Sequence, residues 1–169
     1  MVVEKIFDDF LTVREGLTEK EREFILHKLI DISVRKGELI IKEGDVGNSM
    51  YFIIDGKVKI FKKHLGKELE LAVLEDGDFF GEMALLDEFP RSASVVALTD
   101  CRLHELSKGD FKELIEEYPH LGVKIVSSIA NELSKRIRLA NRRIEDLFFL
   151  TEGLIENEKF REFCNLMFK

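Results

Sequence analysis

The feature that most constrains this chain is a series of short, β-rich segments between Gly37 and Leu106, divided by glycine and aspartate turns. No stretch of helical length separates these segments, which argues against a parallel α/β fold, because parallel strands need long crossover connections. Several short strands at this spacing predict an antiparallel sandwich or barrel, most simply a jelly roll. Asp55 and Gly56 lie between two apolar-rich runs and form the clearest hairpin signal.

Helices are predicted on either side of the β-rich segments. Residues 1–34 are predicted to be helical, with Thr18 and Glu21 at capping-box spacing before the apolar positions. After the strands, Ser107 is predicted to begin a helix that ends near Tyr118, because a proline follows. Proline suits the first turn of a helix, so a further helix is expected to begin there.

The helix expected to begin at Pro119 carries a long apolar stripe. Its members recur at spacings of three and four residues: Ile125, Ile129, Leu133, Ile137, Ala140, Ile144 and Leu147. This narrow stripe is close to the seam of a coiled coil. A helix packed on its own sheet would also explain it. The stripe is longer than a small barrel needs, however, which favours a helix shared by two subunits.

We therefore expect a mainly β protein with flanking α-helices, namely an antiparallel double-stranded β-helix (jelly roll) followed by a long dimerisation helix. The expected parts are an N-terminal helical lead-in at 1–34, a β-roll with its capping helix at 35–118, the long C-terminal dimerisation helix at 119–150, and a short terminal amphipathic segment at 151–169. In the last segment, Phe160, Phe163 and Met167 recur at helical spacing.

Charge and hydropathy argue against several classes of protein. The 26 basic and 33 acidic residues give a net charge of -7, which disfavours nucleic acid unless basic residues gather on one face. No apolar run approaches the length of a membrane span, and the first residues do not resemble a signal peptide, so we expect a cytoplasmic protein with no membrane contact. Cys101 and Cys164 are too few for a disulfide framework and are expected to be reduced thiols.

No catalytic or metal site is expected. The chain lacks the close pair of histidines on a strand that metal sites in jelly rolls use, its histidines being His27, His64, His104 and His120. No nucleophile stands with a recognisable base either. We therefore expect no enzyme activity and no catalytic cofactor.

The segment from Asp78 to Val95 carries the functional signal. Gly81, Glu82 and Arg91 interrupt its alternation, and residues 82–86 have the composition of one short helical turn. Glycine lets the backbone approach a ligand closely, and the N-terminus of a short helix offers unpaired amides to a phosphate. Arg91 adds a guanidinium that matches phosphate oxygens, whereas Glu82 suits a neutral donor such as a sugar hydroxyl. Together they describe a site for a phosphorylated ribose; a plain surface ion pair is the alternative.

These residues resemble a known cassette. The run Gly81-Glu82-Met83-Ala84-Leu85-Leu86, followed after four residues by Arg91-Ser92-Ala93-Ser94-Val95, looks like the phosphate-binding cassette of the cyclic nucleotide-binding domain. The turn glycines in GELIIKEGD, YFIIDGKVKI and LEDGDFFGE fit the same domain. That family includes the bacterial cAMP receptor protein, the regulatory subunits of cAMP- and cGMP-dependent kinases, and the cyclic nucleotide-gated channels. The resemblance extends over residues 10–150.

The resemblance implies a role for each cassette residue. Arg91 would bind the cyclic phosphate and Glu82 the ribose 2'-hydroxyl. Backbone amides near Glu82 and Ala84 and the Ser92 hydroxyl would complete the site, with Gly81 giving room. The implied ligand-binding residues are Gly81, Glu82, Met83, Ala84, Arg91, Ser92, Ala93 and Asn141.

The expected ligand is cAMP, with cGMP open. Ser92 resembles the cAMP-binding bacterial proteins, whereas threonine is usual in cGMP sites. In the bacterial receptor the long helix closes over the purine, and the matching region here contains Asn141. An asparagine amide both donates and accepts hydrogen bonds, so it suits an adenine edge; a solvated helix asparagine is the alternative.

The same resemblance bears on the output of the domain. Bacterial regulators of this kind continue into a helix-turn-helix domain of roughly another 70 residues. Too few residues follow Leu147 here, so we expect that domain to be lacking and the partner to be an unknown protein effector. Ligand is expected to favour one arrangement of the long helix in a homodimer.

Two alternatives remain open at this stage. One is DNA binding through residues 121–143, where six basic residues against one acidic residue give a local charge of +5. A solvated helix face explains that charge more simply. The other is a structural dimer whose cassette is a relic.

Overall fold

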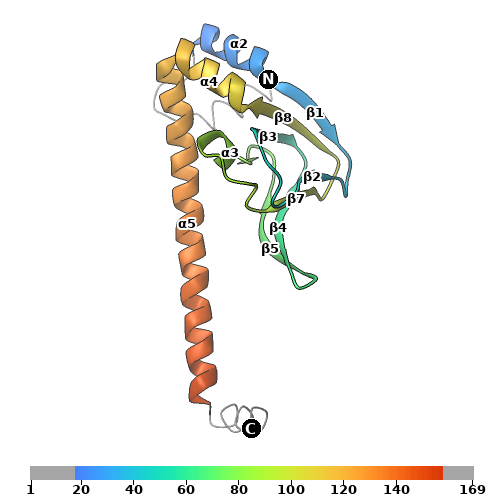
Figure 1. Cartoon of the computed structure of the whole chain (residues 1–169), viewed down its shortest axis with the longest axis vertical. Coiled ribbons are helices and arrows are strands. Elements are labelled where there is room, and N and C mark those ends of the chain that lie inside the picture. The colour runs from blue at the N-terminus through green and yellow to red at the C-terminus, as the bar shows by residue number, and fades with distance from the viewer. Residues whose placement is uncertain (1–17, 158–169) are drawn as a thin grey trace. The chain divides into compact units, whose positions relative to one another are not determined.

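The computed structural model describes residues 18–157 and divides them into two compact units between Ser128 and Ile129 (Figure 1). The first helix of the described residues is α2 (Glu19–Lys28), whose N-terminus has the predicted capping box. The Thr18 backbone N–H donates to Glu21 Oε2 at 2.7 Å, and the Glu21 N–H donates to Thr18 Oγ1 at 3.4 Å. Residues 1–17 and 158–169 lie outside the described part, together with the predicted stripe of Phe160, Phe163 and Met167.

Between residues 18 and 157, eight strands form two antiparallel four-stranded sheets, which confirms the predicted jelly-roll architecture. One sheet has the order β1 (Ile30–Val34), β8 (Cys101–Ser107), β3 (Ser49–Asp55), β6 (Phe79–Phe80). The other has the order β2 (Leu39–Ile41), β7 (Ser94–Ala97), β4 (Val58–His64), β5 (Lys67–Leu74). Chain neighbours such as β7 and β8 thus lie in opposite sheets, as Figure 1 shows.

The predicted helix over residues 1–34 is wrong at its C-terminal end. Residues Ile30–Val34 form β1, which pairs antiparallel with β8 in the register Ile30 to Glu105. The segment alternates β-branched Ile30, Ile32 and Val34 with polar residues, a pattern that suits a pleated strand better than a helix. The partner strand lies about 70 residues further along the chain, so its contribution was not visible locally.

The hairpin predicted at Asp55 and Gly56 is also wrong, because β3 and β4 belong to different sheets. The turn carries the chain from one sheet to the other. The hairpin lies instead between β4 and β5, at Leu65 and Gly66, whose φ angles are 51° and 76°. Positive φ at both central residues is the signature of a type I′ turn.

The core lies between the two sheets. Its buried members are Val34, Ile41, Ile53, Val58, Leu74, Phe80, Val95, Ala97, Cys101 and Leu103. On β3, Ile53 faces this core, while the alternate residues Met50 and Phe52 are buried as well, at 0% and 1% exposed. Both faces of β3 are therefore covered, which makes it one of the most constrained strands of the roll.

Helix α4 (Lys108–Glu117) follows β8 as predicted. Ser107 is its N-cap and accepts from the backbone N–H of Asp110 at 3.0 Å, and the helix ends at Tyr118, before the proline. Helix α5 (Pro119–Glu156) begins there and continues through residues 151–156, beyond the expected end at 150. Among the helices of the described residues, none is both long and apolar enough to cross a membrane.

The N-terminal helix α2 is attached to both later helices within the first unit. Lys28 Nζ lies 2.7 Å from Glu113 of α4, and the Phe24 ring packs 4.8 Å from the ring of Tyr118. Glu21 is buried and pairs with His120 in the first turn of α5. Burial raises the pKa of Glu21, but hydrogen bonds from Thr18 and His120 outweigh this effect and leave the pKa lowered.

Candidate functional site

The predicted cassette is a connection between β6 and β7 that contains one short helix. Gly81 follows β6 with φ at +78°, a conformation that side-chain-bearing residues rarely adopt. Helix α3 (Met83–Leu86) comes next, with Glu82 as its N-cap residue. The predicted helical turn within the β domain is therefore present. Glu82 and Ala84 are each 4% exposed, whereas Met83 is exposed.

Arg91 joins the two ends of this connection. Its Nη1 donates to the carbonyl oxygen of Gly81 at 3.0 Å, and its Nη2 donates to Ser49 Oγ at 3.4 Å. Its backbone is held too: the Arg91 N–H donates to Asp45 at 2.8 Å, and the Gly44 N–H donates to the Arg91 carbonyl at 2.9 Å. Both the peptide and the guanidinium of Arg91 thus have defined positions.

Two glycines leave room for the Arg91 side chain. A Cβ atom on Gly47 would lie 2.0 Å from Arg91 Nε and 2.4 Å from Cζ. A Cβ atom on Gly81 would lie 2.7 Å from Arg91 Nη1. Real Cβ atoms do not approach other atoms so closely, so a side chain at either position would displace the guanidinium.

The surroundings of Arg91 are partly buried and carry negative charge. Burial lowers the pKa of the guanidinium, and Tyr51, Glu105 and Glu82 oppose that shift. Because an arginine side chain loses its proton only at strongly alkaline pH, Arg91 stays charged at neutral pH. The site therefore presents a permanent, half-buried cation.

The remaining cassette residues lie close to these groups. Ser92 is exposed, and its hydroxyl lies 3.8 Å from the Met83 sulfur; Ala93 is half-buried. The Ala84 amide, predicted to face a phosphate, here donates to the Gly81 carbonyl at 3.2 Å. The Gly81 carbonyl thus accepts from both Ala84 and Arg91, so a ligand would compete for that amide.

The structure brings seven of the eight predicted residues into one segment: Gly81, Glu82, Met83, Ala84, Arg91, Ser92 and Ala93. The eighth, Asn141, is exposed on α5 in the second unit. Its role toward a ligand stays a prediction.

Several neighbours of Arg91 escaped the sequence analysis: Gly47, Ser49, Tyr51 and Glu105. One of them had a detectable signal. Along β8, Cys101 and Leu103 belong to the core between the sheets, so the alternation places Glu105 on the same face. A carboxylate at a core-facing position of a strand indicates a polar partner inside.

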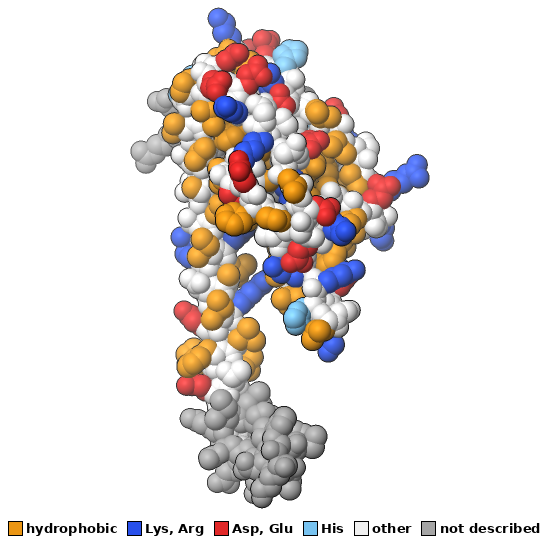
Figure 2. All heavy atoms as spheres, in the orientation of Figure 1, with side chains coloured by type: hydrophobic (Ala, Val, Ile, Leu, Met, Phe, Trp, Pro, Cys, Tyr) orange, Lys and Arg blue, Asp and Glu red, His pale blue; other side chains and the backbone are white. Residues whose placement is uncertain are grey.

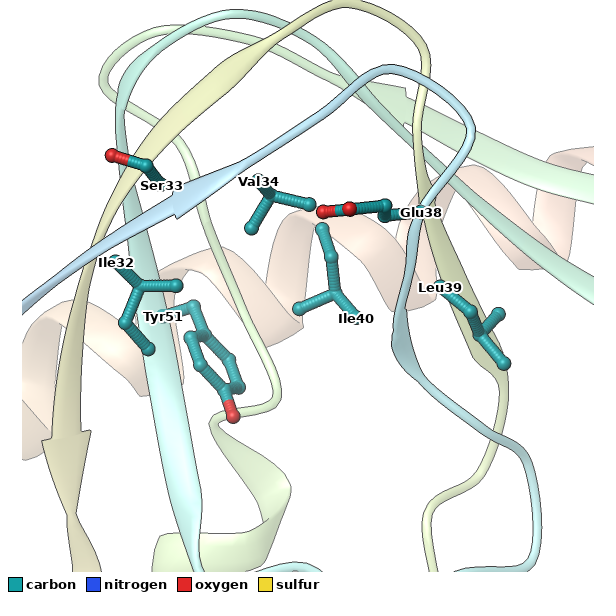
Figure 3. A pocket seen from close by; sticks show the side chains of 7 residues that line it. All are labelled: Ile32, Ser33, Val34, Glu38, Leu39, Ile40 and Tyr51. Carbon is teal, nitrogen blue, oxygen red and sulfur yellow. The ribbon is translucent and has the colours of Figure 1, made fainter.

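Two cavities lie near these residues. A cleft of about 420 Å³ is lined by β1 and β2, and Figure 3 shows Val34, Ile40 and Tyr51 pointing into it. A smaller cavity of about 180 Å³ is lined by Arg91, Ser49, Tyr51 and Glu105, among others. Tyr51 lines both cavities, so its side chain borders the cleft as well as the smaller cavity beside Arg91.

Fold and site together define a class of protein: an antiparallel β-roll whose β6–α3–β7 connection holds an arginine and a buried glutamate beside a short helix. Within that class the chain belongs to the cyclic nucleotide-binding domain family, whose family model matches residues 31–118. The model of this family describes a domain that binds cyclic nucleotides. Among the described residues, no group of histidine, cysteine, aspartate or glutamate side chains is arranged to hold a metal ion.

Individual relatives agree with this assignment. The cyclic AMP receptor protein of Thermus thermophilus is 37% identical over 135 residues, which is 79% of this chain and 61% of that protein. The crystal structure of the Thermus thermophilus catabolite activator protein matches with a TM-score of 0.70 and 35% identity, over 83% of this chain and 63% of that one. The cAMP-bound regulatory domain of Toxoplasma gondii PKA matches with a TM-score of 0.60 and 31% identity, over 67% of this chain and 43% of that one.

The chain thus spans about three fifths of the length of these two bacterial proteins (61% and 63%).

Proposed function

We propose that this chain is a sensory module that binds cAMP in the β6–α3–β7 cassette and passes the binding event to α5. The observation that carries the proposal is the placement of Arg91, whose peptide and guanidinium are both held beside the buried Glu82. A fixed, half-buried cation next to a buried carboxylate suits a ligand with both an anionic phosphate and a neutral hydroxyl. The cAMP-bound relative supports the choice of ligand.

In this proposal Arg91 binds the cyclic phosphate and Glu82 accepts a hydrogen bond from the ribose 2'-hydroxyl. The exposed Ser92 hydroxyl adds a donor to the phosphate. Gly81 and Met83 border the ligand, with the backbone of Ala84 and Ala93 beside it. Asn141 of α5 is proposed to meet the purine.

A direct contact links the cassette to the C-terminal helices of the first unit. Lys108, the first residue of α4, donates through Nζ to the carbonyl of Asp87, which caps α3, at 2.8 Å. At the other end of α4 the corner is tightly packed, since a Cβ atom on Gly122 would lie 2.6 Å from Ile115 Cγ1. A shift of α3 on ligand binding would therefore act on α4 and on the start of α5.

We further propose that α5 pairs with a second copy of the chain. Leu121, Ile125 and Ile129 at its start are buried, at 0%, 2% and 0% exposed. The same stripe continues with Ile137, Ile144 and Leu147, which are 60%, 63% and 61% exposed. Figure 2 shows such hydrophobic side chains on the visible face of the helix in the second unit. An apolar seam at this spacing is complementary to an identical helix.

Titration calorimetry of nucleotide-free protein with cAMP and cGMP in parallel tests the ligand. Mass spectrometry would first establish that the purified protein carries no nucleotide. We expect heat with cAMP, weaker or no heat with cGMP, and a loss of about 100-fold in affinity for Arg91→Leu, because charge-assisted hydrogen bonds to the phosphate are lost.

A matched control is Arg102→Leu, which removes an exposed arginine from β8 outside the cassette. It should leave the affinity unchanged. Absence of heat with either nucleotide from folded wild-type protein would reject the ligand assignment and return attention to the relic-site alternative.

The DNA-binding alternative draws on the basic residues of α5. Lys135 and Arg136 both lie 3.3 Å from Glu132, so part of that charge is internally paired. A gel-shift at low and moderate salt, with and without nucleotide, separates the two functions; a shift that weakens steeply with salt would favour DNA.

A further inference from the structure

A chain of hydrogen bonds runs from Arg91 away from the cassette helix. Arg91 Nη2 donates to Ser49 Oγ at 3.4 Å, and the Ser49 hydroxyl donates to Tyr51 Oη at 3.1 Å. The Tyr51 hydroxyl donates in turn to Glu105 Oε1 at 3.1 Å. Every hydroxyl accepts once and donates once, so the chain has one direction, from a cation to a carboxylate.

Rigid elements hold each member of this chain. Ser49 and Tyr51 lie on β3, and the register places Tyr51 opposite both Glu105 of β8 and Phe80 of β6. The Tyr51 ring stacks on Phe80 with centroids 5.2 Å apart and an interplanar angle of 20°. Phe80 directly precedes Gly81, the residue whose carbonyl accepts from Arg91. These contacts fix the position and the orientation of the Tyr51 phenol relative to the Arg91 guanidinium.

Burial makes the chain electrostatically significant. Ser49 is 2% exposed, and Tyr51, Glu105 and Arg91 are all half-buried. Charges interact more strongly where water is partly excluded, so a carboxylate at the far end stabilises the guanidinium in its observed place. Glu82, the other acidic neighbour, is assigned to the ribose and is buried on the cassette side.

We propose that Glu105 is a positioning residue for Arg91, acting through the hydroxyls of Tyr51 and Ser49. The proposal rests on the function proposed above, in that Arg91 binds the phosphate of the ligand. Glu105 itself does not touch the ligand in this scheme. It holds the guanidinium of Arg91 in its place before the nucleotide arrives.

The first test is calorimetry with cAMP on Tyr51→Phe and Glu105→Gln, which remove a hydroxyl and a charge with little change of volume. We expect each to weaken binding by about tenfold. Matched controls are Tyr118→Phe, the other tyrosine, and Glu70→Gln, an exposed glutamate of β5; both should bind as wild type does.

A double-mutant cycle separates positioning from a general loss of structure. In an Arg91→Lys background the guanidinium is absent, so Glu105→Gln should weaken cAMP binding by less than about twofold. An equal loss in both backgrounds would mean that Glu105 supports the roll as a whole, and would overturn the proposal.

A second measurement does not depend on any ligand. Tyr118→Phe leaves Tyr51 as the sole tyrosine, and the chain has no tryptophan, so ultraviolet absorbance at alkaline pH reports Tyr51 alone. Burial raises the pKa of Tyr51, Glu105 raises it further, and Ser49 and Arg91 lower it. In this background Glu105→Gln should lower the midpoint of the titration and Arg91→Leu should raise it.

The two measurements keep the proposals apart. If wild-type protein binds no nucleotide but both midpoints shift as expected, the proposed function fails while the hydrogen-bond chain and its hold on Arg91 stand. If wild-type protein binds cAMP and Tyr51→Phe and Glu105→Gln bind equally well, the positioning role is rejected. Unshifted midpoints in folded variants would also reject it.

Discussion

Arg91 occupies a slot lined by two glycines, and the slot leaves no room for larger side chains at these two positions. The side chain passes over Gly47 and reaches Gly81, where added Cβ atoms would lie 2.0 Å and 2.7 Å from its guanidine nitrogens. The slot therefore depends on residues that offer no functional group. Their contribution is the volume that they leave free for the one cation of the cassette.

Gly47→Ala should accordingly impair binding more than folding. The new methyl group displaces the guanidinium, so we expect cAMP affinity to fall by about tenfold while the thermal midpoint changes little, as measured by calorimetry and thermal unfolding. Gly109→Ala on α4 is the control, because its Cβ would meet only Ser107 Oγ at 3.7 Å. Equal binding by both variants would contradict the importance of the slot.

The surroundings of His104 are expected to affect how the stability of the protein depends on pH. It is 6% exposed on β8, and neither ring nitrogen makes a hydrogen bond within the described residues, although Nδ1 lies 3.1 Å from Asp31 of β1. Burial lowers the pKa of His104; Arg102 on the same strand lowers it too, whereas Asp31 opposes the shift. Phe52, opposite on β3, is uncharged.

The stability of the protein should therefore fall as the medium becomes acidic. The unfolded chain takes up the proton of this histidine at a pH of about 6.5, before the folded protein does, so acidification below that value favours unfolding. Denaturant unfolding between about pH 7.5 and 5.5 should show a loss that His104→Leu reduces. His64→Leu, at an exposed position, should keep the wild-type slope.

At the scale of single elements, the β4–β5 hairpin contains one unfavourable residue. Leu65 has φ at 51° and is 89% exposed, so it adopts a strained left-handed conformation with nothing to pack against. Asparagine tolerates this conformation and is favoured before glycine in a type I′ turn.

Leu65→Asn should therefore raise the free energy of unfolding by about 0.5 to 1 kcal/mol. Denaturant titration provides the measurement. Leu69→Asn, an equally polar change at an exposed strand position, should give no gain because asparagine is disfavoured in strands. A gain in both variants would point to solubility and not to the turn.

Elements with local signals were predictable from the sequence. The caps at Thr18 and Ser107 and the helix start at Pro119 each depend on residues within one turn, and all are confirmed. Elements that depend on pairing with strands far along the chain could not be predicted in this way. Strand β1 exists because it pairs with β8, and the turn at residues 55–56 crosses between sheets because β3 pairs with β8.

The residues of the candidate site likewise fall into a group that the sequence predicts and a group that it does not. Its cassette is contiguous from Gly81 to Ala93 and was recognisable as a pattern of residues. Ser49, Tyr51 and Glu105 come from two strands whose pairing register alone brings them behind Arg91. No local sequence rule links positions so far apart in the chain, so these three residues could be assigned to the site only from the structure.

At the scale of the whole molecule, the proposed pairing of two copies depends on the exposed apolar stripe of α5. A double variant, Ile144→Glu and Leu147→Glu, places charges at two apolar positions of the proposed seam. We expect sedimentation velocity to change from dimer to monomer, because buried like charges oppose pairing. Ser134→Glu, at an exposed polar position, should remain dimeric. A monomeric wild type would contradict the shared helix.

The backbone pairing of Arg91 with Gly44 and Asp45 has a thermodynamic consequence for recognition. A loop that is disordered without ligand loses conformational entropy on binding, and this loss subtracts from the affinity. Here that loss has already occurred during folding, because the peptide of the arginine is hydrogen-bonded to the backbone of Gly44 and Asp45. The phosphate of a nucleotide would meet a preorganised cation, so a large share of the interaction energy would be retained as affinity.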